Sequence, residues 1–416
     1  MIPLIDNIAE NVTIDGFTLQ DEKDVNDEYA ATVGVCSEQG NFNAKNNRVI
    51  GLPMFGIYVA RSAADVTTIG TIVNVEISNN YIKGTALSDL SGTWAHAINL
   101  LGTVGDVLNN VIDQSRTGIA IQPYNQPSVE IDEDGLVDGN IFNTYSAGVF
   151  NHQGGAWNHY AVSGNWTFSN NEFNLTDTLP AGIETKTTYT AVHTRASEFY
   201  FNKSITYINN TFDVSNVGTI GYVKENIEGF TYRNDIFHNF TQQHTAADIN
   251  FIYTNNTFTS DDFDFYFDRS SGDTYPTYPP MEIDLADIKT DNTFTDGSVI
   301  FGDKLVAPSK VNVVNTTQGL GYETIQDAID AATSGDIINV AAGTYAEAIT
   351  IDTAKVITLQ GAGNATTIIQ PTAGLNAITI SSIAAQSLTI KDIQLVLSGA
   401  GRGIEAADDM SSTTIA

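Results

Sequence analysis

Short alternations of apolar and polar residues recur through the first 300 positions, and a fixed pattern introduces most of them. The pattern is Asn (once Asp), any residue, and then a large apolar residue. Alternation with a period of two predicts short strands with one buried face. The pattern occurs nine times between residues 47 and 294, beginning at Asn47, Asn80, Asn110, Asn140, Asn171, Asn210, Asp235, Asn256 and Asn292.

The spacing of this pattern predicts a solenoid. Successive occurrences are 33, 30, 30, 31, 39, 25, 21 and 36 residues apart, and a mark repeated at this scale is typical of stacked structural repeats. A long β-sandwich with Asn-rich turns is the alternative, but sandwich turns have no fixed pattern. The sequence therefore favours an all-β, right-handed parallel β-helix over residues 1–300.

The chemistry of asparagine fits a corner of such a coil. Asparagine tolerates the left-handed backbone conformation that a sharp turn needs. Stacked coils would also place each Asn above the last, so we expect the amides to form a hydrogen-bonded ladder. A glycine followed by a β-branched residue comes later in several coils, at Gly56, Gly118 and Gly148. We interpret it as the next corner and the next strand.

The pattern changes after residue 300. Residues 261–308 are irregular, and residues 301–314 are expected to be a linker. Apolar residues at Ile325, Ala328, Ile329 and Ala332 then fall at i, i+3, i+4 and i+7, which predicts an amphipathic helix over about 323–333. Short strands are expected at 337–340, 348–351, 356–359, 367–369, 377–380 and 387–390.

Residues 322 to about 370 resemble the opening of parallel β-helix proteins of the pectin-lyase-like superfamily. The resemblance rests on Thr324-Ile-Gln-Asp-Ala-Ile-Asp-Ala-Ala, Gly335-Asp336, Gly343-Thr-Tyr345 and Glu347. It implies a capping helix and a first coil, so residues 315–416 are expected to begin a second β-helix. The superfamily includes polysaccharide lyases, glycoside hydrolases, tailspikes, adhesins and surface-layer components, and the fold does not choose among them.

The first module has no such cap. Residues 11–19 already have the pattern of an inner coil, and they match residues 387–395 at an offset of 376 positions. Because an open coil end exposes apolar side chains and strand edges, we expect a tandem array of β-helical modules. Its partners would be neighbouring repeats or further copies of the chain.

Charge and composition exclude some functions. The chain has 18 basic and 49 acidic residues, a net charge of −31, which disfavours nucleic acid and anionic membranes as partners. No apolar stretch is long enough for membrane insertion, and the N-terminus does not resemble a signal peptide. Cys36 is the only cysteine, so no internal disulfide forms. Nine Asn-x-Ser/Thr sequons permit glycosylation.

The search for catalytic residues gives weak candidates. The Asn-Thr-Asp, Asp-Asp and Gly-His-Gly patterns of polygalacturonase-like hydrolases are absent as a set. A polysaccharide lyase would need a basic residue to remove the proton beside a uronate carboxylate, and His193, Arg195 and Lys203 are the candidates. A loop with scattered polar residues is the simpler interpretation of this segment.

Two further kinds of site are considered. Exposed aromatic rings stack on sugars, and Trp94, Trp157 and Tyr160 are candidates for glycan binding, although they would equally fill the core of an inserted loop. Calcium prefers carboxylate oxygens, and two acidic segments offer them at Asp132, Asp134, Asp261, Asp262 and Asp264. Neither segment fits the twelve-position calcium loop, and solvated turns account for both.

The sequence thus predicts an extracellular structural or adhesive protein of a prokaryotic surface, built of tandem β-helices and requiring no cofactor. A carbohydrate-active enzyme, in the form of a polysaccharide lyase, is the first alternative. A calcium-dependent glycan-binding module is the second.

Overall fold

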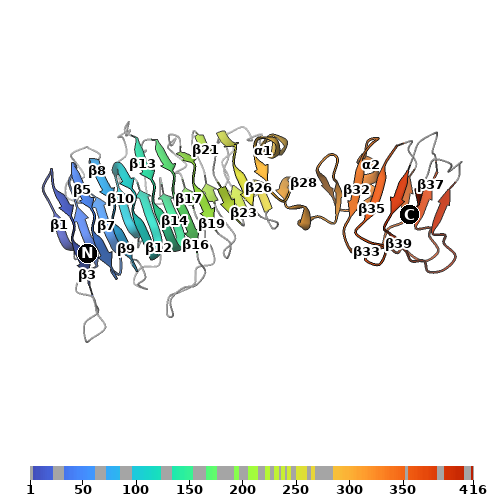
Figure 1. Cartoon of the computed structure of the whole chain (residues 1–416), viewed down its shortest axis with the longest axis horizontal. Coiled ribbons are helices and arrows are strands. Elements are labelled where there is room, and N and C mark those ends of the chain that lie inside the picture. Colours follow the sequence, from blue (N-terminus) through green and yellow to red (C-terminus); the bar gives the residue numbers. More distant parts are fainter. Residues whose placement is uncertain are drawn as a thin grey trace, which may run out of the picture. The chain divides into compact units, whose positions relative to one another are not determined.

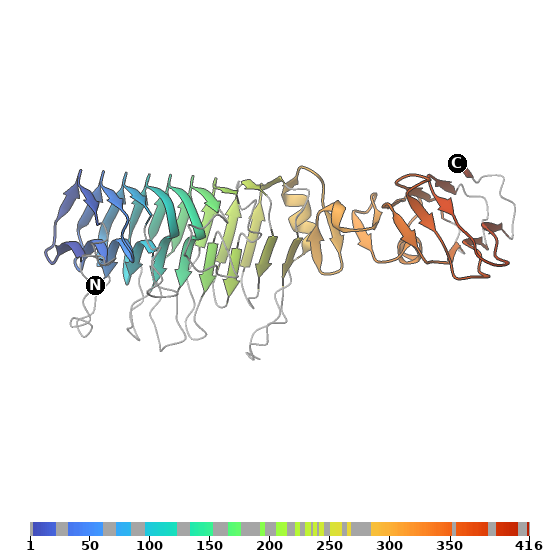
Figure 2. The same ribbon diagram turned by 90° about the horizontal axis from the view of Figure 1, so that it is seen from below.

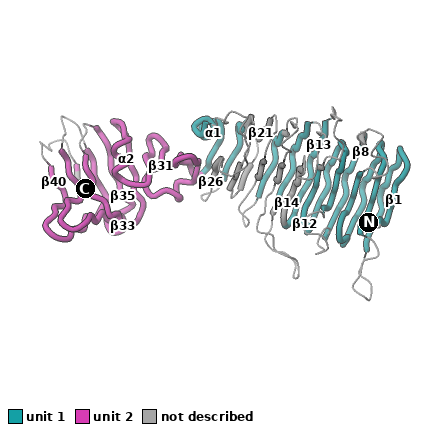
Figure 3. Tube along the Cα trace, turned by 180° about the vertical axis from the view of Figure 1, so that it is seen from behind, with its two compact units in different colours: residues 1–295 teal, residues 296–416 magenta. Residues whose placement is uncertain are grey.

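A computed structural model of the chain describes most of its strands and both helices, and the chain divides into two compact units, residues 1–295 and 296–416 (Figures 1 and 3). The described residues are 3–21, 32–60, 72–84, 96–122, 134–152, 165–175, 192–195, 205–213, 221–224, 229–233, 236–238, 241–244, 250–259, 264–267, 284–351, 355–381, 388–406 and 414–415.

Unit 1 is a parallel β-solenoid of three ladders, stacked coil on coil (Figure 2). Ladder 1 contains β1 (Pro3–Asn7), β4 (Val33–Ser37), β7 (Phe55–Ala60), β10 (His96–Leu101), the later parts of β12 (Val111–Gln122) and β14 (Ile141–His152), β17 (Val192–Arg195), β20 (Gly221–Lys224), β23 (Thr241–His244) and β26 (Asp264–Phe267).

Ladder 2 contains β2 (Thr13–Asp15), β5 (Phe42–Lys45), β8 (Ile72–Ser78), β11 (Thr103–Leu108), β13 (Gly135–Asp138), β15 (Trp166–Ser169), β18 (Ile205–Ile208), β21 (Gly229–Arg233) and β24 (Asn250–Thr254). Ladder 3 contains β3 (Thr18–Gln20), β6 (Arg48–Ile50), β9 (Tyr81–Lys83), the first parts of β12 and β14, β16 (Glu172–Leu175), β19 (Thr211–Asp213), β22 (Ile236–His238), β25 (Thr257–Thr259) and β27 (Thr293–Phe294). The all-β parallel solenoid predicted from the sequence is confirmed.

The predicted asparagine ladder lies at the corner between ladders 2 and 3. Asn80 shows the repeating geometry. Its Oδ1 accepts hydrogen bonds from the backbone N–H and Nδ2 of Asn47 at 2.9 and 3.0 Å. Its Nδ2 donates to the Ala44 carbonyl at 2.8 Å and to Asn110 Oδ1 at 2.9 Å. Each amide thus satisfies buried backbone groups of the coil before it and binds the amide of the coil after it.

The ladder asparagine is not the residue with the left-handed backbone, and that part of the sequence interpretation is wrong. The residue directly in front takes this conformation, with φ of 56° at Asn46, 57° at Asn79, 53° at Asn109 and 68° at Gly139. The residue in front of the ladder asparagine and the ladder asparagine itself therefore have different roles. The first turns the chain, and the second, which is buried, joins successive coils.

A column of phenylalanines packs inside ladder 3. The rings of Phe142 and Phe173 stack with centroids 4.9 Å apart and an angle of 3°, and those of Phe173 and Phe212 at 4.8 Å and 5°. Phe258 and Phe294 stack in the same way at 4.6 Å. Parallel in-register pairing brings identical residues into contact from coil to coil, so the apolar residue of each repeated pattern forms the core.

The glycines expected at the next corner lie within strands instead. Gly56 belongs to β7, and Gly118 and Gly148 belong to β12 and β14. The reason is visible at Gly56, where a Cβ atom would come within 2.6 Å of the Ala97 carbonyl and 2.8 Å of an Ile82 methyl group. Glycine there permits close packing of neighbouring coils.

A short helix that the sequence interpretation missed lies near the end of unit 1, before β27. Helix α1 (Leu285–Asp291) follows the Asp284 N-cap, whose side chain accepts from the Ala286 N–H at 2.8 Å. Asn292, the last ladder residue, donates from Nδ2 to the carbonyls of Ile288 at 2.7 Å and Tyr253 at 3.0 Å. The final asparagine thus caps the helix and binds the last strand of ladder 2.

Unit 2 begins at Asp296 and includes residues 301–314, which were expected to be a linker. Its opening contains β28 (Val299–Phe301), β29 (Lys304–Val306), a 3₁₀ turn at Pro308–Lys310, β30 (Val313–Asn315), β31 (Leu320–Tyr322) and α2 (Ile325–Ala331). Its coils also form three ladders. The first contains β32 (Ile337–Val340), β35 (Thr358–Gly361), β38 (Thr389–Lys391) and β41 (Thr414–Ile415). The second contains β33 (Gly343–Tyr345), β36 (Thr367–Ile369) and β39 (Gln394–Leu395), and the third contains β34 (Ile349–Ile351), β37 (Ile378–Ile380) and β40 (Ile404–Ala406).

The predicted capping helix is confirmed as α2. Thr324 is its N-cap, accepting from the Asp327 N–H at 3.0 Å. The Glu347 carboxylate accepts from the N–H groups of Ile325 and Gln326, each at 3.1 Å, and so satisfies donors that the helix leaves free. Ile325, Ala328 and Ile329 are buried against the first coil. None of the helices in the described part of the chain is long and apolar enough to cross a membrane.

Candidate functional site

Strand β17 carries two of the three predicted lyase residues, His193 and Arg195. The third, Lys203, lies outside the described residues. Strand β17 pairs with β14 on one side and β20 on the other. In this register Arg195 lies between His152 and Lys224, and His193 lies between Phe150 and Tyr222.

These positions share one face of ladder 1. They alternate with Val192 and Thr194, which continue the register rows of the buried core residues Ile119 and Ile121. Adjacent strands lie about 4.8 Å apart, so residues at equal register are close neighbours. His152, Arg195 and Lys224 are at equal register, and His193 lies two positions before Arg195 on the same face. We call these four residues the basic row.

The basic row stands out against the charge of the chain. Strands β14, β17, β20 and β23 contain no acidic residue, although the chain has 49 acidic residues and 18 basic ones. Asp264, in β26, is the next acidic position along this ladder. Within these four described strands, the positions on this face therefore include basic and titratable residues and no acidic one.

The lysines of ladders 2 and 3 show the opposite arrangement. Lys45 Nζ lies 2.7 Å from Glu76 Oε2, and this hydrogen bond lowers the pKa of the Glu76 carboxyl below its usual value. Lys83 Nζ lies 3.6 Å from Asp113, which also accepts from the Tyr81 hydroxyl at 3.0 Å. These cations stand beside carboxylates of the neighbouring coil, and such exposed pairs contribute little to stability.

The residue types of the basic row suit an acidic ligand. Arginine binds carboxylates through two parallel hydrogen bonds, lysine attracts them as a point charge, and histidine exchanges protons near neutral pH. Repetition across three strands would let successive acidic groups of a polymer meet successive cations. Proton removal beside a carboxylate, the first step of a lyase reaction, needs these residue types.

Most of the predicted calcium ligands have no described side chain. Asp132, Asp261 and Asp262 lie outside the described residues, and only the backbone of Asp264 is described. Asp134 is exposed, and its Oδ1 accepts from Asn165 Nδ2 at 2.8 Å. Among the described side chains, no three imidazole, thiol or carboxylate groups gather closely enough to hold a metal ion. Calcium binding stays a prediction.

The aromatic glycan-binding candidates Trp94, Trp157 and Tyr160 lie outside the described residues. The remaining tryptophan, Trp166, is in the core of unit 1, where its indole occupies the space beside Gly135.

Sequence reasoning did not assign Tyr222 or Lys224 to a site. Their signal is an offset: Lys224 follows Arg195 by 29 residues (224 − 195), close to one coil, so Val192-His-Thr-Arg195 aligns with Gly221-Tyr-Val-Lys224. Loops of unequal length separate successive coils, so the alignment of Arg195 with Lys224 is not apparent from the sequence. Strand pairing makes it plain.

No protein-family model matches the chain, and no curated protein matches it. Among solved structures, the chain is similar to the PL6 family alginate lyase AlyGC, with 12% identity, a TM-score of 0.20 and coverage of 99% of this chain and 70% of that one. A mutant of the same enzyme matches with 12% identity, a TM-score of 0.18 and the same coverage. The fold assigned above rests on the strand pairings and not on these likenesses.

Proposed function

We propose that the protein is a structural and adhesive component of a prokaryotic cell surface, in which β-helical units join in series into a stiff rod. The observation that carries this proposal is a repeated coil. In unit 1, strand β2, the left-handed residue Gly16 and strand β3 follow one another. At an offset of 376 residues, β38, the left-handed residue Asp392 and β39 do the same.

The two coils also agree in burial. The central residue of β2, Ile14, is 5% exposed, and that of β38, Ile390, is 3% exposed. A coil near one end of the chain is therefore built like a coil near the other. This is the arrangement expected where one module of an array passes into the next.

In the described part of the chain, one side of the first coil has no neighbouring coil. Among the described strands, β1, β2 and β3 each pair with one strand only. Leu4 and Phe17 of this coil are exposed, Phe17 by 53%. A free strand edge beside apolar side chains favours pairing with another coil. A preceding coil of the same array or a second copy of this chain can supply one.

Sedimentation velocity over a range of protein concentrations, with electron microscopy of the same samples, tests the proposal. We expect rods that lengthen with concentration and keep the width of one solenoid. Phe17→Asp places a charge at the first coil and is expected to abolish lengthening. Ile252→Asp is the matched control, because Ile252 is 43% exposed on the side of the solenoid, in β24 of ladder 2. Monomers at every concentration, or equal effects of the two variants, would contradict the proposal.

The basic row favours a second function, binding or cleavage of an acidic polysaccharide. In the cleavage reaction, Arg195 and Lys224 would neutralise a uronate carboxylate, and His193 would take the proton from the adjacent carbon. The electron pair left on that carbon would form a double bond to the neighbouring carbon as the bond from that neighbour to the glycosidic oxygen breaks, and the departing oxygen would take the proton from the protonated His193.

Incubation with polygalacturonate and with alginate, followed by ultraviolet absorbance of the unsaturated product, measures cleavage. Affinity electrophoresis in the same polymers measures binding. Retardation without product, reduced in Arg195→Ala and Lys224→Ala, would assign adhesion. Product formation lost in His193→Ala would assign a lyase, and neither signal would remove this function.

A further inference from the structure

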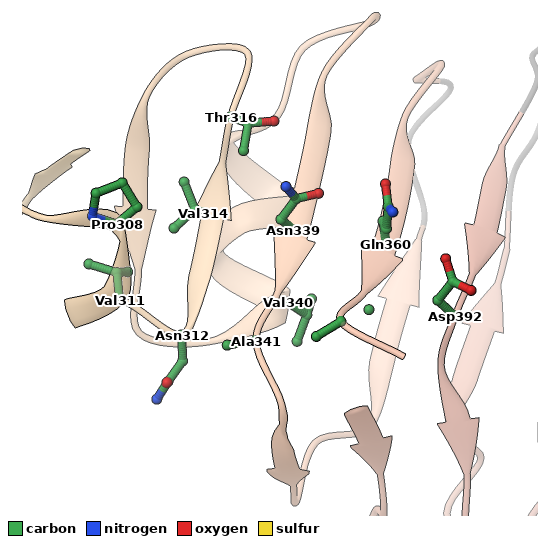
Figure 4. Close-up of a pocket in the computed structure, with 12 residues that line it drawn as sticks. Pro308, Val311, Asn312, Val314, Thr316, Asn339, Val340, Ala341, Gln360 and Asp392 are labelled. Carbon is green, nitrogen blue, oxygen red and sulfur yellow. The ribbon is translucent and has the colours of Figure 1, made fainter. Parts of the chain in front are cut away.

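A groove on the outer face of unit 2 has the properties of a second binding site. Its volume is about 490 Å³, and it crosses β30, β32 and β35 to reach the corner at Asp392 (Figure 4). It is lined by Pro308, Val311, Asn312, Val314, Thr316, Asn339, Val340, Ala341, Gln360, Gly361, Ala362 and Asp392. The groove is separate from the basic row and from the free edge of the first coil, both of which belong to unit 1.

The polar side chains of the groove have unused hydrogen-bonding capacity. Those of Asn312, Asn339, Gln360 and Asp392 make no hydrogen bond to another group in the described part of the chain. Asn339 and Asn312 are exposed and Gln360 is half-buried. Three primary amides and a carboxylate thus line the groove with free donors and acceptors.

Three other amides of unit 2, at Asn315, Gln318 and Gln326, are used differently. Asn315 and Gln318 both donate to the Asp336 carboxylate, at 2.8 and 2.6 Å. Gln326 donates to the Thr350 carbonyl at 2.9 Å and accepts from the Thr350 N–H at 2.7 Å. Amides that stabilise this unit therefore bind its own backbone and side chains. The groove amides stand apart from that network.

The register orders the groove as a row across the sheet. Val314, Asn339, Gln360 and Lys391 occupy equal positions on β30, β32, β35 and β38, and Figure 4 shows Val314, Asn339 and Gln360 on successive strands. Val311 and Val314 are buried and, with Pro308, give the groove an apolar end. Strands repeat about every 4.8 Å, a spacing close to the residue repeat of an extended glycan.

The charge of the groove selects the class of ligand. No cation is among its lining residues, and Asp392 adds a carboxylate to a chain of net charge −31. An acidic polymer would be repelled. Sugar hydroxyls, which donate and accept, match primary amides and carboxylates, and the face of a sugar ring matches the half-buried Pro308. We infer that this groove binds a neutral glycan chain lying across the strands of unit 2, with Asn339 and Gln360 each contacting one sugar residue.

Isothermal titration of the full chain with cellohexaose, xylohexaose, laminarihexaose and, as the charged comparator, hexagalacturonate tests the inference. We expect at least one neutral hexasaccharide to bind. The double variant Asn339→Ala, Gln360→Ala is expected to weaken it by about tenfold or more, because two hydrogen bonds are lost. Hydrogen exchange with the bound sugar should slow in β32 and β35.

Gln394→Ala is the matched control, because Gln394 is an exposed amide of unit 2 on β39, outside the groove. Circular dichroism checks that all the variants fold. The inference is overturned if no neutral hexasaccharide binds at millimolar concentration, if hexagalacturonate alone binds, or if the double variant binds as well as the control. These outcomes do not depend on whether the chain forms rods or on the basic row.

Discussion

The two units close equivalent corners by different means. In unit 1 the corner after ladder 2 carries the asparagine ladder, with one amide in each of eight described coils. Seven are buried, at Asn47, Asn80, Asn110, Asn140, Asn171, Asn210 and Asn256, and the last, at Asn292, is half-buried. In unit 2 the turns after β32, β35 and β38 carry Ala341, Ala362 and Ile393. There, Thr367 Oγ1 accepts from the Ala362 N–H at 2.9 Å and donates to the Ala341 carbonyl at 3.1 Å.

The difference between these corners indicates which residues stabilise each unit. A device repeated in every coil spreads stability along the solenoid as a sum of nearest-neighbour terms. Unit 2 has a polar cluster at its opening, where Glu347 caps α2 and four groups donate to Asp336. We therefore expect unit 1 to tolerate damage to one coil with local effects, and unit 2 to depend on a few residues near α2.

The largest effect tests whether the cores of the units are independent. Phe173→Ala removes the middle ring of a stack and is expected to lower the free energy of unfolding of unit 1 by about 3–5 kcal/mol. Leu359→Ala, at a fully buried position of β35, should lower that of unit 2 by about 2–5 kcal/mol.

Urea titrations followed by hydrogen exchange of peptides from each unit measure both changes. Tryptophan fluorescence adds a signal from unit 1 alone, because the three tryptophans are Trp94, Trp157 and Trp166. If Phe173→Ala destabilised both units equally, the division into separately stabilised units would be wrong.

The next effect tests the ladder. Asn80→Ala removes an amide that serves the backbone of Asn47, the carbonyl of Ala44 and the side chain of Asn110, leaving buried polar groups without partners. We expect a loss of about 3 kcal/mol in unit 1, because each unsatisfied group costs about 1–3 kcal/mol and relaxation recovers part of it. Faster exchange should be confined to β6, β9 and their neighbours. A loss below about 0.5 kcal/mol would show that the ladder contributes little to the free energy of unfolding.

The third effect belongs to unit 2. Burial alone would raise the pKa of the Asp336 carboxyl, but hydrogen bonds from Thr333, Asn315 and Gln318 outweigh it and lower the pKa. A lowered folded pKa stabilises the unit above the ordinary value of about 3.9, and that stabilisation is lost as the pH falls through the folded pKa.

Unit 2 should therefore lose stability below about pH 4. Asp336→Asn should cost about 1–3 kcal/mol at pH 7 and progressively less in acid. Urea midpoints of unit 2 at several pH values test this expectation, and a variant with the wild-type acid profile would contradict it.

The sequence predicted the repeated features and the strongly patterned helix α2, and it missed helix α1. The Asn pattern located the ladder and the apolar stack, because parallel in-register pairing copies a residue type from coil to coil. The stripe at Ile325, Ala328 and Ile329 located α2. Helix α1 was not predicted because its apolar stripe is short and lies in a region dominated by turn residues.

Long-range neighbours were the harder part of the candidate site. His193 and Arg195 could be named from composition, but the alignment of Lys224 with Arg195 depends on strand register across loops of unequal length. The groove amides likewise come from strands 20 or more residues apart, and their lack of partners within the fold depends on side-chain positions. A linear pattern contains neither kind of information.

The smallest effect separates the two residues of one asparagine pair. Asn79 is exposed with φ of 57°, whereas its neighbour Asn80 is 1% exposed and belongs to the ladder. Glycine adopts positive φ without a Cβ penalty, so Asn79→Gly should change the free energy of unfolding by less than about 0.5 kcal/mol. Asn79→Ala should cost about 1–2 kcal/mol, because alanine is strained in this conformation.

Asn80→Gly, in contrast, should be at least as damaging as Asn80→Ala, because the lost hydrogen bonds and not the backbone conformation set its cost. Tryptophan-monitored urea titration of the four variants compares them directly. If glycine were equally harmless at both positions, the left-handed turn would account for the whole Asn pattern. The corners of the two units would then differ only in backbone geometry, and the side-chain hydrogen bonds of the ladder would not contribute to the stability of unit 1.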